Sequence, residues 1–229
     1  MKYFGSGLSE KHKELAKIIR KEDMLTSSKK LFNEIHTALH MSESSCGLAN
    51  EVDLLFNDLL PFEYAIMSAS KDETIAWTIW HIARIEDLTL NILVANSEQI
   101  FNLEWKERLN AVCSDTGNAL TDDEIMLLSK NINTAELLAY RSAVGKRTRE
   151  IVDSLTINDI RRKVSQCGLD KIKSDGGVTK DSEWLLDYWG QKDVAGILLM
   201  PPTRHVMLHL NDCCKLKLQI RTRKRFYSS

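Results

Sequence analysis

Apolar residues recur along most of this chain with the spacing of α-helices. The clearest case is the segment of residues 72–96. One line along it, at i, i+4, i+8, i+11 and i+15, consists of Trp77, His81, Ile85, Leu88 and Ile92. Positions with this spacing share one face of a helix, so the pattern predicts a helix whose face points into a core. The histidine in that line needs an explanation, since a lone histidine on an apolar face is most often a hydrogen-bonded core residue.

The same period predicts several further helices. They cover residues 8–22, 26–42, 51–60, 103–112, a stretch running through Ile132, 133–155, and a last helix from about 193 or 202 to 220. Thr26, Ser27 and Ser28 are candidate N-caps, because a hydroxyl can accept a hydrogen bond from the first turn. Thr121 and Glu124 have the spacing of a capping box. Pro201 and Pro202 should open or kink the last helix.

The segment of residues 156–190 is the least regular part of the chain. Within it, "GLDKIKSDGGVTKDSEW" contains an Asp-Gly-Gly turn and is predicted to form a loop or a small hairpin. Together these patterns predict an all-α protein of one domain, residues 1–229. Its four long helices would form a bundle, preceded by an extra N-terminal helix and with an elaborated connection before the last helix.

Composition excludes several classes of protein. The chain has 229 residues, 43% of them hydrophobic, and a formal net charge of −1, so nothing draws it toward nucleic acid or an anionic membrane. It has no run of about 18 apolar residues and no apolar signal segment near its start, so we expect no membrane-spanning helix. Its five cysteines have no CxxC spacing, which suits reduced thiols in a cytoplasmic protein.

The last helix carries two more histidines, in "PPTRHVMLHLND". His205 and His209 are four residues apart, so their side chains lie on one helix face with about 6 Å between their Cβ atoms. Cys213, Leu216 and Ile220 continue that line, which indicates that the face points inward. With His81 from another helix, the three imidazoles suit Zn, Ni, Cu or Fe and leave a coordination position open.

This interpretation has an ordinary alternative. The HxxxH spacing occurs by chance in many helical proteins, and here it occurs a second time at His36 and His40. Burying several imidazoles without partners costs free energy, whereas a metal ion would satisfy them. On spacing alone, a metal site and a set of core histidines are equally well supported.

Other candidates are weaker. His36 or His40 would line the cavity as an outer hydrogen-bonding group or a replacement ligand, or else be solvated or bonded locally. Cys213 is a conceivable fourth ligand, although a small core residue is the better interpretation. Arg84 could hold a substrate carboxylate, but we expect it to pair on the surface with a carboxylate such as Asp87 or Asp53.

Three further features have ordinary explanations of similar or greater weight. Glu86 is a candidate base, although a solvated face is favoured. The segment Trp184–Trp189 would either cap the site or simply pack as a short helix. The basic tail "KLKLQIRTRKRFYSS" fits the C-terminus of a helix, where cations are favoured, so it is not interpreted as a nucleic-acid arm.

Two stretches, "IAWTIWHIARIEDLTLNILV" and "LLMPPTRHVMLHLND", resemble the DinB/YfiT-type family of metal-dependent proteins. The resemblance implies a four-helix bundle in which His81, His205 and His209 hold one divalent metal ion, Zn or Ni before Fe or Mn. It also implies a homodimer, and some members of the family are bacillithiol- or mycothiol-dependent transferases or isomerases.

Three functions are therefore weighed. The first is a metal-dependent S-transferase, or a related hydrolase or isomerase, acting with a low-molecular-weight thiol and an electrophile. The second is a metal-binding stress-response or scaffold protein without turnover. The third is a metal-free interaction module. The sequence assigns no catalytic residue, because it contains no clear pair of general acid and base.

Overall fold

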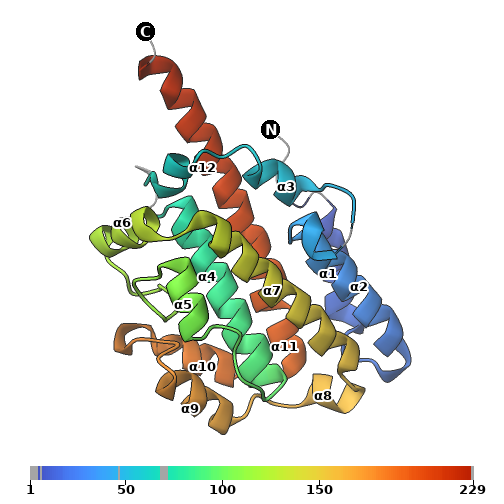
Figure 1. Ribbon diagram of the computed structural model, residues 1–229. Coiled ribbons are helices and arrows are strands. Elements are labelled where there is room, and N and C mark those ends of the chain that lie inside the picture. Colours follow the sequence, from blue (N-terminus) through green and yellow to red (C-terminus); the bar gives the residue numbers. More distant parts are fainter. Residues whose placement is uncertain (1–4, 6, 46, 68–71, 228–229) are drawn as a thin grey trace.

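The computed structural model describes residues 5, 7–45, 47–67 and 72–227 (Figure 1). Within these ranges the chain is helical and has no strand; an isolated antiparallel bridge joins Lys163 to Asp193. The prediction of an all-α fold is confirmed. No helix in the described ranges is long and apolar enough to span a membrane. The four described cysteines, Cys113, Cys167, Cys213 and Cys214, are free, and Cys46 lies outside the described residues.

Helix α4 (Ile75–Asp87) is at the centre of the fold. It continues into a π-helical segment, η4 (Leu88–Val94), and every residue from 75 to 94 is buried. Thr74 caps its start by accepting a hydrogen bond from the backbone N–H of Trp77 at 3.0 Å. Burial on all sides explains why this segment is apolar almost throughout, rather than on one face only.

Two of the other long helices pack directly against α4. Helix α7 (Thr134–Ser154) packs along it, and α12 (Val206–Tyr227) packs against it and then projects beyond the other helices (Figure 1). Helix α2 (Leu25–Ala38) packs against α7 and against the N-terminal helix α1 (Leu8–Ile18). The predicted line of apolar residues on α4 is confirmed as core, since all its members are buried.

Shorter helices complete the fold. They are α3 (Glu51–Phe56), α5 (Leu103–Leu109), α6 (Asp122–Asn131), α8 (Ile157–Arg161), α9 (Gln166–Ser174), α10 (Trp184–Gly190) and α11 (Val194–Leu198). Single helical turns lie between them: η1 (Glu22–Met24), η2 (Ser42–Ser45), η3 (Pro61–Ala65) and η5 (Lys180–Ser182).

Two local predictions are wrong. The segment of residues 168–184 has the predicted turn, at Asp175 and Gly176, but its first part is helical and it forms no hairpin, because Leu169 and Ile172 are three apart, lie on α9 and are both buried. Helix α2 begins at Leu25, so Thr26 and its neighbours lie inside the helix and cannot cap it. The capping box of Thr121 and Glu124 is confirmed at the start of α6.

The two prolines shape the entry to α12. Between α11 and α12 the chain forms a π-helical turn, η6 (Met200–His205), which contains Pro201 and Pro202. Proline has no backbone N–H, so the regular helical hydrogen bonds are interrupted here. The hydroxyl of Thr203 donates to the carbonyl of Leu198 at 2.9 Å and satisfies one of the freed acceptors. The predicted interruption of the last helix is confirmed.

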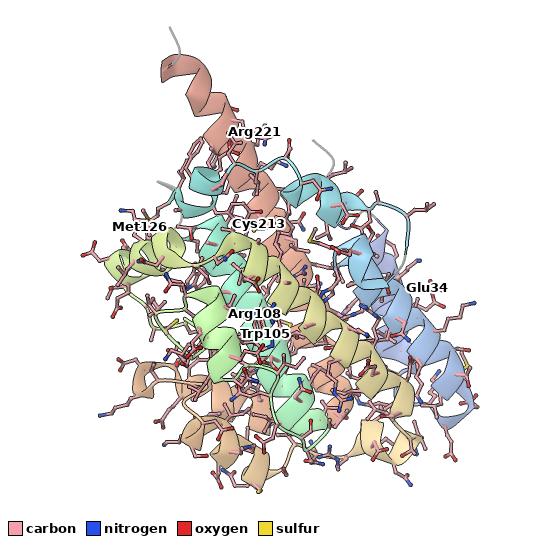
Figure 2. The ribbon with its side chains drawn as sticks, in the orientation of Figure 1. Glu34, Trp105, Arg108, Met126, Cys213 and Arg221 are labelled. Atoms are coloured by element: carbon pink, nitrogen blue, oxygen red, sulfur yellow. The ribbon has the colours of Figure 1, made fainter. Side chains whose placement is uncertain are left out.

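The basic end of α12 is partly used within the chain. Arg221, on the projecting part of the helix in Figure 2, donates to Asp58 Oδ2 at 2.6 Å. Lys217 also donates to Asp58 and to the carbonyls of Leu54 and Leu55. These bonds fasten α12 to the chain around α3.

Candidate metal centre

The structure brings together His81, His205 and His209. Each offers one ring nitrogen, and these three nitrogens lie within 4.8 Å of one another. The Nε2 atoms of His81 and His205 are 3.1 Å apart, and the ring centroids of His205 and His209 are separated by 4.5 Å. His81 is buried, whereas His205 and His209 are partly exposed. The cluster is therefore enclosed on the side of α4 and lies nearer the surface on the side of α12.

Local structure explains why these rings meet. His205 is the last residue of η6, and α12 starts immediately after it, so His205 and His209 lie one turn apart on the same side. On α4, His81 is one turn after Trp77, whose ring stacks on the imidazole at 4.8 Å with an interplanar angle of 11°. The indole thus forms one wall of the cluster.

A loop holds the side chains of α4 in place. Its four consecutive carbonyls each accept a hydrogen bond from a ring or guanidinium N–H of α4: Gly117 from Trp77, Thr116 from His81, Asp115 from Trp80 and Ser114 from Arg84. The first donor, Trp77, pairs with the last carbonyl and the last donor, Arg84, pairs with the first, while the two bonds between them keep the order of the chain. We call residues 114–117 the carbonyl loop.

Gly117 is required by this arrangement. Its φ is +74°, in the left-handed region that favours glycine, and a Cβ there would lie 2.9 Å from Nε1 of Trp77. A larger residue would separate the carbonyl loop from α4.

The hydrogen bond to Thr116 fixes the proton of His81. A carbonyl can only accept, so Nδ1 of His81, at 2.9 Å from Thr116 O, must carry a proton. Burial and the neighbouring His209 lower the pKa of His81 to about 3, so the ring is neutral near pH 7 and its Nε2 has a free lone pair. That lone pair points at His205. Burial, with His81 and His209, also holds the pKa of His205 well below its usual value.

These features fit a divalent ion. Ligation requires neutral imidazoles, and a ligand histidine usually donates its second N–H to a carbonyl or carboxylate, as His81 donates to Thr116. Three nitrogen ligands suit Zn, Ni, Cu or Fe and leave a coordination position for water or substrate. The described chain can therefore hold a metal ion here, and the identity of that ion stays a prediction.

Arg84 is not on the surface. It is buried, and its guanidinium donates to Ser114 O, Asp87 at 3.1 Å, Tyr140 at 2.9 Å and Gln99 at 2.7 Å. Asp87 is indeed its partner, but the pair is part of the core, and Asp53 instead accepts from the backbone of Ser42 and Asn50. The expected surface pairing is wrong because α4 has no solvent-exposed face. Arg84 is engaged in holding the carbonyl loop.

Glu86, His36 and His40 are also buried, so the interpretation of them as solvated groups is wrong. The carboxylate of Glu86 accepts from His36 Nε2 and from the Thr148 hydroxyl, each at 2.7 Å. These residues form a second cluster, separate from the three histidines above. Sequence reasoning missed it because a charged residue within a helix was assigned to an exposed face. The sequence signal for this cluster is Glu86 itself, a carboxylate within the mostly apolar stretch of residues 75–94.

The remaining candidates have structural roles. Cys213 lies in the interior (Figure 2), where burial raises the pKa of its thiol to about 12, and it is outside the histidine group. Helix α10 packs against α9, with Trp189 buried and Trp184 56% exposed. Neither feature contributes a ligand to the cluster.

Comparison with known proteins gives no family for this chain. No family model matches it, and no curated protein matches it either. The geometry of the histidines and of the groups that hold them is therefore the basis for assigning a function.

Proposed function

We propose that this protein binds one divalent metal ion through His81, His205 and His209, as a DinB/YfiT-like four-helix bundle would. The observation that carries the proposal is the hydrogen bond between His81 and the carbonyl of Thr116. The Nδ1–H of His81 is committed to that carbonyl, so the Nε2 lone pair is presented 3.1 Å from Nε2 of His205. Without an ion, two ring nitrogens face each other with at most one proton between them. One ion could bind all three ring nitrogens, because they lie within 4.8 Å of one another.

We further propose that the protein uses this ion to transfer a low-molecular-weight thiol to an electrophile. When bound, the ion would stabilise the anionic form of such a thiol, which is the reactive nucleophile. The chain's own residues orient the site: Thr116 fixes the ring of His81, and Trp77 forms an apolar wall beside it. The partly exposed His205 and His209 leave the α12 side accessible to a small molecule. A homodimer, and Zn or Ni in preference to Fe or Mn, belong to the same proposal by family resemblance.

A second candidate is a metal-binding protein without turnover. One observation favours it: the ionisable side chains of α4 are already engaged. Glu86 is bonded to His36 and Thr148, and Arg84 and Asp87 are bonded to each other. Among the described residues of α4, neither carboxylate is therefore free to act as a general base beside the three histidines.

Metal analysis of protein purified without a histidine tag tests the common part of both candidates. Alanine at position 81, 205 or 209 should each remove most of the ion, since two ligands seldom hold a divalent ion tightly. His12→Ala is the matched control. Its imidazole contacts the carbonyl of Leu199 at 2.7 Å and does not belong to the three-histidine group, so its loss should leave the ion in place. Full occupancy in the His81→Ala protein would reject the three-histidine site.

Turnover separates the two candidates. Metal-loaded protein would be incubated with a small thiol and a panel of alkyl and epoxide electrophiles, and thioether formation followed by mass spectrometry. An S-transferase should form the product, and the His81→Ala protein should not. If the wild-type protein gives no more product than the variant across the panel, the non-catalytic function is favoured.

A further inference from the structure

The second cluster lies between three long helices. Helix α2 carries His36, the residue His40 follows shortly after its end, α4 supplies Glu86, and α7 covers them with Thr148. His36 and His40 are 0% exposed and Glu86 is 1% exposed. One ligand atom from each of these three residues lies within 4.8 Å of the other two.

His40 is poorly satisfied in this position. Neither of its ring nitrogens has a hydrogen-bond partner, and its Nε2 has only an ion-pair contact with Glu86 Oε2, at 3.3 Å. Burial, together with the charge of Arg141, lowers the pKa of His40 to about 3, so the ring is neutral near pH 7. A buried polar group without a partner costs about 1–3 kcal/mol, and that cost needs compensation.

The backbone of α7 is adapted to the ring of His40. Gly145 lies in the middle of this helix, and a Cβ there would come within 2.4 Å of Cε1 and Nδ1 of His40. Glycine inside a helix is less stable than alanine by about 1 kcal/mol. Helix α7 is therefore less stable than it would be with alanine at position 145. The space that the glycine leaves is occupied by the ring of His40, which itself lacks hydrogen bonds.

We propose that His36, His40 and Glu86 form a second divalent-metal site, distinct from the one at His81, His205 and His209. Two imidazoles and one carboxylate are a ligand set that suits Zn and Fe(II). Glu86 is held for this role, because the Thr148 hydroxyl donates to its Oε1 and fixes the carboxylate. An ion would supply the partner that His40 lacks.

Ligation changes the hydrogen bonds of His36. In the structure its Nε2–H donates to Glu86, and its Nδ1 faces Arg149 Nη1 at 3.5 Å. When Nε2 binds an ion, the proton moves to Nδ1 and the contact with Arg149 is given up. Arg149 is partly exposed and also bonds to Ser44, so it can turn away from the ring.

Two cations near the site affect which ion it takes. Arg141 is buried and donates to the carbonyl of Leu39, and Arg149 lies at the edge of the cluster. Both oppose a divalent cation, whereas Glu86 favours it. The site should therefore select ions that bind imidazole strongly, such as Zn²⁺, over Mn²⁺.

Access distinguishes the two sites. The second cluster is closed on all sides, whereas His205 and His209 are partly exposed. An ion at the second site should enter during folding or a transient opening and leave slowly. A chelator should therefore remove the two ions in separate phases, the ion at His81 first.

The decisive experiment uses Zn²⁺ as the probe. Wild-type protein and the triple variant His81→Ala/His205→Ala/His209→Ala are unfolded, refolded with Zn²⁺, dialysed and analysed for metal. We expect two ions per chain in the wild type and one in the triple variant. Refolding in the presence of Zn²⁺ lets the ion reach the closed site while the chain is still open. A missing ion then means that the site does not bind Zn²⁺, and not that Zn²⁺ enters too slowly. His36→Gln/His40→Gln is the reciprocal variant and should keep only the quickly released ion.

Each outcome decides between the two proposals. One ion in the wild type and none in the triple variant would overturn the second site and leave the first intact. One ion in both, lost only in the reciprocal variant, would support the second site and overturn the first.

If either multiple variant fails to fold, wild-type stoichiometry and the Gly145→Ala protein decide. Gly145→Ala should displace His40 and lower slow-phase Zn²⁺ at least several-fold; a wild type with a single, quickly released ion overturns the proposal.

Discussion

The two histidine clusters start from the same sequence pattern and end in different environments. Each has two histidines four residues apart and a third group from α4, which is His81 in one cluster and Glu86 in the other. These two groups are five positions apart on α4, so they point to different neighbours. The first cluster has three imidazoles and a partly exposed side, and the second has a carboxylate and is closed.

This difference shows that the HxxxH spacing does not by itself determine chemistry. The group on the central helix decides whether the imidazoles face other imidazoles or an anion. Burial then decides whether a small molecule can reach them. His36 donates a hydrogen bond to the carboxylate of Glu86, which is an acceptor in any case. His81 and His205 meet through two ring nitrogens, and only one of these can carry the proton between them.

The largest expected effect is acid destabilisation, to which both clusters contribute. The pKa values of His40 and His81 are lowered to about 3 and that of His205 is also well below 6.5, so the unfolded chain binds protons first as the pH falls. Stability from these groups is complete above pH 6.5 and declines below it, by about 1.4 kcal/mol per pH unit for each histidine. For His40 and His81 together this is roughly 4 kcal/mol between pH 6.5 and 5, and His205 adds to it in the same direction.

Urea titrations of metal-free protein at pH 7, 6 and 5 measure this decline. His40→Gln and His81→Gln should each remove about a third of the slope, which assigns the effect to one cluster or the other. The lowered pKa of Glu86 does not interfere, because its stabilisation is lost only below about pH 4.5. A midpoint that is constant over this range would show that the histidines are not buried in neutral form.

Next in size is the loss of charge at Glu86. Although burial opposes ionisation, the neighbouring His40 and His36 lower the pKa of this carboxyl, so it is an anion beside the buried cation of Arg141. Glu86→Gln leaves that cation uncompensated and should cost about 3–5 kcal/mol in the unfolding free energy. The control is Glu34→Gln, on the outer side of α2 (Figure 2), whose ion pair with Lys11 is exposed and should be worth about 0–1 kcal/mol. Equal effects would mean that the second cluster is hydrated.

Ile85 tests the packing of α4 between the two clusters. It is buried on the same line as His81, one turn further along the helix. Ile85→Ala should cost about 2–5 kcal/mol, the usual range for a large-to-small change in a core. Leu127→Ala, at a position that is 53% exposed, should change stability by less than about 0.5 kcal/mol in the same denaturant titration. A loss within error for Ile85→Ala would mean that α4 is oriented differently.

The smallest expected effect is that of Gly145→Ala, and its sign depends on His40. In the wild type the added methyl meets the imidazole, so the variant should lose about 1–3 kcal/mol. In a His40→Ala background the same change should stabilise by about 1 kcal/mol, because alanine is the better helix former. A double-mutant cycle by urea unfolding measures this reversal, and the same sign in both backgrounds would contradict the close contact.

Local patterns in the sequence predicted much of the secondary structure but less of the site. The apolar line from Trp77 to Ile92 correctly predicted a buried helix, because periodicity and burial are linked directly. The hairpin was wrong because a glycine turn in the sequence does not reveal that Leu169 and Ile172 are buried on a short helix.

The partners of α4 could not be found in this way. A helix buried on every side has no exposed face, so periodicity assigned Glu86 and Arg84 to solvent that does not reach them. The second cluster depends on contacts between residues 36 and 86 and between 86 and 148. Such distant pairings are set by how helices pack, and no local pattern records them.

The carbonyl loop has a consequence for the entropy of the site. Residues 114–117 have no helical hydrogen bonds of their own, yet their carbonyls accept from α4, and the N–H of Thr116 donates to Gly177 O at 3.1 Å. The amide of Thr116 should thus exchange with solvent deuterium as slowly as those of the core helices. A ring tethered to so rigid a segment has lost its rotational freedom on folding, before any ligand arrives. Binding at His81 then has little conformational entropy left to overcome, which makes the site preorganised.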